Sequence, residues 1–167
     1  MRILVISNYY PPIELGGWEQ LTSNVVSRLI ARGHQIEILT SNYRAKEVRR
    51  DEAGIHRHLH LESYDPVNYH PKSTLYFRRQ EDENRKVLNN IVSKFDPEII
   101  FINGMWNLPV TVAKNAEAVR PGRVVYYMAS YWPTEPDAHT AYWTSEADNK
   151  IKQIPKQIIG SILRKSS

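Results

Sequence analysis

Aromatic, amide and glycine residues follow four short apolar runs of this sequence, and these residue types suit recognition of a polar ligand with apolar faces. The four stretches are SNYYPPIELGGWE at 7–19, TSNY at 40–43, NGMWN at 103–107 and SYWP at 130–133. Aromatic rings stack on an apolar face, while amides and hydroxyls hydrogen-bond a polar edge. The candidate binding residues are Asn8, Tyr9, Trp18, Glu19, Asn103, Trp106, Ser130, Tyr131 and Trp132, each of which could equally be a core or rim residue.

The adjacent glycines Gly16 and Gly17 are the most adaptable backbone among these stretches. Glycine lets a ligand approach the main chain closely, and free N–H groups at the start of the following helix favour an anion such as a phosphate. Glu19, in the first turn, also suits the helix dipole. A tight loop with no ligand explains the pair as well, and Trp18 either packs beneath the loop or lines a cleft.

Three histidines alternate in GIHRHLHLE, residues 54–62, so a strand there places His56, His58 and His60 on one face. Metal sites normally draw ligands from several elements, so we expect an exposed strand face and no metal. A metal enzyme built on this strand is the third interpretation. The chain has no cysteine, which excludes a thiolate nucleophile and any Cys-ligated metal.

The elements that must position these residues alternate between strands and helices. Apolar runs and turn residues predict strands at 2–7, 34–41, 54–62, 98–103 and 123–129, helices at 17–32, 73–94 and 109–119, and a loop at 42–53. Ile151, Ile154, Ile158, Ile162 and Leu163 predict a last amphipathic helix that Pro155 kinks or shortens. The alternation favours a Rossmann-like, doubly wound, mostly parallel α/β sheet with helices on both faces. Ligands bind such sheets outside the carboxyl ends of the strands, where all four stretches fall.

Composition fits one soluble globular domain, with 41% hydrophobic and 24% charged residues and a formal net charge of +4. Basic residues gather at 44–50 and again after 150. A solvated charged face is the simplest interpretation, anionic lipid or an anionic substrate is the alternative, and nucleic acid is not expected. The absence of a long apolar run predicts a cytoplasmic protein, with peripheral contact at the inner face of a membrane left open.

Familiar cofactor motifs are missing from the sequence. G-x-G-x-x-G, G-x-x-x-x-G-K-[ST], G-x-S-x-G and H-E-x-x-H are all absent, which disfavours dinucleotide, P-loop, α/β-hydrolase and zinc-protease chemistry. In contrast, MRILVISNYYPPIELGGWEQ, LIARGHQIEILTS, DPEIIFIN and VVYYMASYWP occur in this order over most of residues 1–133. This combination resembles the N-terminal, acceptor-side domain of family-4 glycosyltransferases with the two-domain GT-B fold.

The resemblance implies transfer of a sugar from a nucleotide-activated donor, UDP- or GDP-linked, without a bound metal or a tightly bound cofactor. It makes Gly16 and Gly17 the loop that faces the donor phosphates. The acceptor is a sugar or a lipid-linked molecule, and the partner is a C-terminal donor-binding domain, in cis or as a separate subunit. Family members commonly carry a histidine where this chain has Ala129 and Ser130, so no catalytic residue is assigned.

We therefore expect residues 1–167 to be one acceptor-side domain that ends before its last strand, with the donor-binding domain absent and catalysis incomplete in this chain alone. The alternative is a non-catalytic module or partner subunit that binds a carbohydrate or a lipid-linked acceptor in the same cleft.

Overall fold

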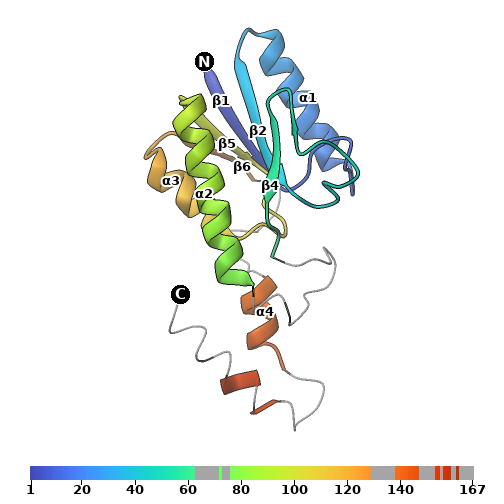
Figure 1. Ribbon diagram of the computed structural model, residues 1–167, viewed down its shortest axis with the longest axis vertical. Helices are drawn as coiled ribbons and strands as arrows, with labels where there is room; N and C mark the ends of the chain where they lie inside the picture. Colours follow the sequence, from blue (N-terminus) through green and yellow to red (C-terminus); the bar gives the residue numbers. More distant parts are fainter. Residues whose placement is uncertain are drawn as a thin grey trace.

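A six-stranded sheet with helices packed against it forms the body of the molecule (Figure 1). The computed structural model describes residues 1–62, 72, 76–128, 138–146, 153–154, 156–158 and 161. The elements in chain order are β1 (Arg2–Ser7), α1 (Trp18–Ala31), β2 (Gln35–Ser41), β3 (Asp51–Glu52), β4 (Ile55–Leu59), α2 (Phe77–Phe95), β5 (Ile99–Asn103), α3 (Val110–Val119), β6 (Val124–Tyr127) and α4 (Ala138–Thr144).

The strand order across the sheet is β3-β4-β2-β1-β5-β6. Every pairing is parallel except the short β3, which runs antiparallel to β4. The α/β class and the mostly parallel sheet predicted from the sequence are confirmed. From β1 the chain builds outward through β2 and β4, then returns to place β5 on the other side of β1. The order therefore reverses between β1 and β5, the position at which open α/β sheets bind ligands.

The central strand β1 explains why its sequence is apolar without a break. Leu4 and Ile6 belong to the larger core cluster, which includes side chains of α2 and α3. Ile3 and Val5 belong to the smaller cluster, which includes Val26 of α1. Since alternate side chains of a strand point to opposite faces, α1 covers one face of the sheet and the α2–α3 pair covers the other.

Helix ends follow the local turn chemistry. Gly33 has φ of +83° and its N–H donates to the Ile30 carbonyl, so it ends α1 as the sequence predicts. Asp96, with φ of +49°, ends α2 just before Pro97. The helix predicted at 73–94 is observed as α2 from Phe77, with Tyr76 as the residue before it. Residues 73–75 lie outside the described part.

Two short elements were not predicted. The expected loop at 42–53 contains β3, whose two residues pair with β4 through a turn at Ala53 and Gly54, both with positive φ. Helix α4 has only seven residues, too few for an apolar period to be read. Residues 153–154, 156–158 and 161 are helical, in agreement with the last predicted helix as far as it is described. No helix in these described ranges is long and apolar enough to cross a membrane.

Candidate functional site

A pocket of about 320 Å³ opens at the carboxyl edge of the sheet, where β1, β5 and β6 end. It therefore lies at the reversal of strand order. Six of the residues proposed from the sequence come together there: Asn8, Tyr9, Gly16, Trp18, Glu19 and Trp106. Leu15, Gly104, Met105 and Tyr127 complete the lining.

Four aromatic rings line this pocket: Tyr9 and Trp106 lie in the loops after β1 and β5, Trp18 is the first residue of α1, and Tyr127 is the last residue of β6. The Trp18 ring lies 5.4 Å from that of Tyr127, and the Tyr9 ring lies 6.4 Å from that of Trp106, measured between ring centroids. Trp106 is 52% exposed, so its ring is free to cover a ligand. Burial raises the pKa of Tyr9 to about 12, so its hydroxyl stays protonated at neutral pH and is no general base.

Gly104, which the sequence analysis did not single out, lets two walls of the pocket meet. Its φ is +92°, and a Cβ there would lie 2.5 Å from Trp18 Nε1 and 2.8 Å from Asn8 Oδ1. Its carbonyl also accepts a hydrogen bond of 3.0 Å from the Asn8 N–H, which joins the loops after β1 and β5. No side chain fits at this position, so the approach of Trp18 to β5 depends on glycine.

Gly16 and Gly17 differ from Gly104, because nothing in the described chain requires them to be glycine. Neither has a positive φ, and a Cβ on either would meet no atom within 4 Å. Gly17 directly precedes α1, and its carbonyl accepts a 3.1 Å hydrogen bond from the Leu21 N–H. The absence of a side chain there leaves open space above the first turn of α1.

The Gly16 N–H is already occupied. It donates a 3.1 Å hydrogen bond to Glu19 Oε2, and the Glu19 side chain is buried at 3% exposure. The sequence analysis expected free N–H groups at the start of the following helix, and the Gly16 N–H lies two residues before α1. A phosphate can bond the Gly16 N–H only if the Glu19 side chain moves away. The geometry therefore suits a ligand that lies close to the loop better than an anion that is bound by the Gly16 N–H.

Asn103 is not among the pocket residues, although it was proposed as one. It is 1% exposed at the end of β5, and its Nδ2 donates a 2.9 Å hydrogen bond to Thr22 Oγ1 on α1. This bond fixes the helix to the strand, so Asn103 supports the site from within the core. Ser130, Tyr131 and Trp132, the other three candidates, lie outside the described residues.

Arg57 on β4 is the largest fully buried side chain among the residues that the structure describes, and the sequence analysis missed it. Its guanidinium donates to the Tyr10 carbonyl at 3.0 Å and to the Pro11 carbonyl at 2.6 Å. Burial lowers the pKa of this guanidinium. The signal was present in the sequence, because Arg57 follows the apolar Ile55 by two residues on the strand, the spacing that places two side chains on one face. Arg57 holds the start of the loop that carries Gly16 and Gly17.

His56 and His58 on β4, and His60 directly after this strand, are half-buried and lie beside carboxylates, rather than fully exposed as expected. His56 lies 3.0 Å from Asp51 and 3.1 Å from Glu37, and His58 lies 3.0 Å from Asp51. His60 lies 2.8 Å from Glu83 on α2. Over the residues with a described position, no group of three or more His, Asp or Glu side chains has an arrangement that could hold a metal.

A comparison with models of protein families and with curated proteins finds no match for this chain.

Proposed function

We propose that this chain is the acceptor-side domain of a glycosyltransferase that moves a sugar from a UDP- or GDP-linked donor. In this proposal the sheet is one Rossmann-like, doubly wound half of a GT-B enzyme. The nucleotide is held by a donor-binding domain, in cis or as a separate subunit. The resemblance in the loop after β1 and in the strand sequences suggests this family, and the pocket at the strand ends is the observation that carries the proposal.

The lining of the pocket supports a sugar as the ligand. Trp106 and Tyr127 are about half exposed, and Trp18, the first residue of α1, places its ring against that of Tyr127. Aromatic rings that remain open to solvent suit the apolar face of a pyranose ring. Glu19 lines the same pocket, and carboxylate oxygens are suitable acceptors for the hydroxyl groups of a sugar.

The glycine pair supports a ligand that comes close to the main chain. Since neither Gly16 nor Gly17 is required by its own backbone conformation or by its neighbours, we infer that a group outside the described chain occupies the space above them. In a two-domain transferase, this group is the donor sugar and its diphosphate at the domain boundary. Close packing there positions the reacting carbon against the acceptor, which lowers the barrier by orientation.

Calorimetric titration with UDP- and GDP-sugars tests this division of roles. The chain alone is expected to bind them weakly, with Kd of about 1 mM or higher. Gly16→Ala with Gly17→Ala is expected to weaken that binding further, because the added methyl groups fill the approach to the loop. Gly122→Ala, on a turn with φ of +68° that does not line the pocket, strains the backbone without filling the approach to the loop, so it controls for a general loss of stability.

Tight binding that is carried by the nucleotide and unaffected by the Gly16 and Gly17 changes would contradict the proposal, because a complete nucleotide site would then lie in this chain. The alternative function, a carbohydrate-binding module without transfer, shares the aromatic pocket. It predicts that free sugars bind as well as nucleotide sugars and that the double glycine variant binds both like the unchanged protein.

A further inference from the structure

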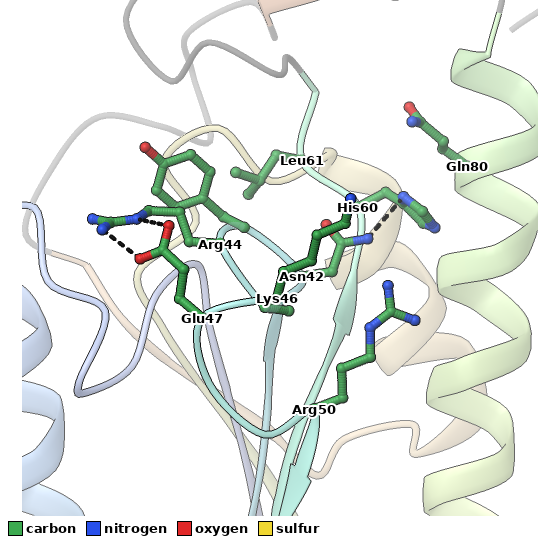
Figure 2. Close-up of a pocket in the computed structure, with 10 residues that line it drawn as sticks. Asn42, Arg44, Lys46, Glu47, Arg50, His60, Leu61 and Gln80 are labelled. Carbon is green, nitrogen blue, oxygen red and sulfur yellow. Dashed lines mark hydrogen bonds and ion pairs between the residues drawn. The ribbon is translucent and has the colours of Figure 1, made fainter.

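A second hollow lies beside the first, between the loop after β2 and helix α2 (Figure 2). It consists of a pocket of about 400 Å³ and a neighbouring one of about 360 Å³. The two have Asn42, Arg50 and His60 in common, so they form one surface, which we call the basic pocket. It follows β2 and β4 at the same carboxyl edge of the sheet as the aromatic pocket.

Cations dominate the lining of the basic pocket. Four lining residues are basic and two are acidic: Arg44, Lys46, Arg50 and Lys86 against Glu47 and Glu83. Arg44 forms an ion pair with Glu47, and Glu83 forms one with Arg79. Lys46, Arg50 and Lys86 have no ion pair with any residue whose position is described. Three exposed cations therefore surround the hollow without a counter-charge of their own.

Polar groups at the base are held in fixed orientations. Asn42 Nδ2 lies 3.2 Å from His60 Nδ1, and His60 Nε2 lies 2.8 Å from Glu83 Oε2 (Figure 2 shows the first contact). The neutral tautomer that accepts from Asn42 and donates to Glu83 satisfies both contacts. Asn42 keeps its second amide hydrogen for a ligand. The Asn84 side chain bonds both the N–H and the carbonyl of His60, which secures this residue against α2.

The basic pocket and the aromatic pocket share a wall. Tyr43 lines the first and Tyr9 the second, and their rings meet edge to face with centroids 5.5 Å apart. Leu61 adds an apolar surface beside Tyr43. One ligand can therefore place a sugar ring among the aromatic residues and a charged substituent among the cations.

We propose that the basic pocket binds the phosphate group of a phosphorylated acceptor, with Lys46, Arg50 and Lys86 as its cationic contacts. The binding of phosphate rests on this pocket alone, and only the statement that the phosphate belongs to the acceptor rests on the proposed function. Arginine and lysine bind phosphate through charge-assisted hydrogen bonds, which are the strong class of such bonds.

The sequence offers a matched control for this inference. Arg49 and Arg50 are neighbours, both are exposed, and only Arg50 lines the basic pocket. Arg49→Gln and Arg50→Gln remove the same charge, so any general attraction of anions changes equally in both. Lys46→Gln is the second variant inside the pocket.

The test is titration of the full chain with inorganic phosphate, followed by the amide signals of residues 42–50 and 58–61 in NMR spectra. Arg50→Gln and Lys46→Gln are each expected to weaken phosphate binding about tenfold, the effect of one lost charge-assisted contact. Arg49→Gln is expected to bind as the unchanged chain does. No shifts in these segments, or equal weakening by Arg49→Gln and Arg50→Gln, would overturn the inference.

Two further arms identify the source of the phosphate, and both positive results support the inference. A soluble acceptor predicts that glucose 6-phosphate binds more tightly than phosphate or glucose alone. A lipid acceptor predicts binding to phosphatidylcholine vesicles only when they contain phosphatidic acid, with loss in Arg50→Gln. If Trp106→Ala leaves glucose 6-phosphate binding unchanged while Arg50→Gln weakens it, the sugar site of the proposed function fails and the phosphate site stands.

Discussion

Gly104 and Gly16 at the candidate site differ in whether the fold requires glycine, and substitution by alanine distinguishes the two cases. Gly104→Ala forces a strained backbone and a collision with Trp18 and Asn8, so we expect the free energy of unfolding to fall by about 1–3 kcal/mol. Gly16→Ala meets neither problem and should change stability by less than about 0.5 kcal/mol. Urea denaturation measures both. Equal losses for the two variants would show that the loop itself needs Gly16.

His60 predicts a pH dependence of stability. Burial lowers the pKa of its imidazole below the ordinary value, Glu83 opposes this, and Arg50 and Arg79 add to it. The unfolded chain therefore takes up the proton at higher pH than the folded chain. Stability is complete above the unfolded pKa of about 6.5 and declines as the pH falls through it.

Urea denaturation of the unchanged chain and of His60→Gln, between about pH 7.5 and pH 5.5, measures this contribution. His60→Gln keeps a donor for Glu83 and should show a smaller loss of stability on acidification. The same slope in both proteins would mean that other groups cause the pH dependence.

Residue types alone were enough to predict most of the aromatic pocket, because strand ends in a parallel sheet meet at one edge. They could not separate Trp106, which is exposed to the pocket, from Asn103, whose amide is used inside the core. Asn103 is the last residue of β5 and Trp106 lies in the loop after it, so the path of the chain beyond the strand decides which side chain faces the pocket. The requirement for glycine at position 104 was equally hard to predict, because a side chain there would collide with Trp18, which is distant in sequence.

At the scale of elements, a single strand residue supports the loop after β1. Arg57 spans from β4 to the carbonyls of Tyr10 and Pro11, so the start of this loop is tied to the sheet by charge-assisted bonds. Arg57→Met leaves these carbonyls without their donor. The lost bonds outweigh the relief of burying a charge, so we expect a loss of about 2–3 kcal/mol in the free energy of unfolding.

Hydrogen exchange should also rise at the amides of Ile13 and Gly16 in Arg57→Met, because the loop loses its anchor. Arg49→Met, at an exposed position, is the control and should leave both stability and exchange as they were. A stable Arg57→Met variant with normal exchange in this loop would contradict the anchoring role.

Long elements were predictable because burial imposes a period on them. The apolar runs of β1 and β5 are packed on both faces of the sheet. On α1, Val26 and Leu29 are three residues apart and pack in the same core cluster. Short elements have no such period. The two residues of β3 are both exposed, so their pairing with β4 depends on the turn at Ala53 and Gly54 rather than on an apolar pattern.

At the scale of the whole molecule, the carboxyl edge of the sheet carries two adjoining surfaces of different chemistry. The ends of β1, β5 and β6 present aromatic rings and open glycines, while the loop after β2 presents cations together with α2. The rings of Tyr9 and Tyr43 lie at the boundary. This arrangement fits a ligand with a sugar ring at one end and an anionic group at the other.

Saturation-transfer NMR on the full chain measures whether the aromatic pocket holds a sugar ring. Irradiation of protein protons should transfer magnetisation to the ring protons of a bound monosaccharide. We expect this transfer to be lost in Trp106→Ala and retained in Trp143→Ala, whose ring packs on Tyr142 and is not part of the pocket. Absence of transfer from the unchanged chain to any monosaccharide, or transfer that survives Trp106→Ala, would contradict the account.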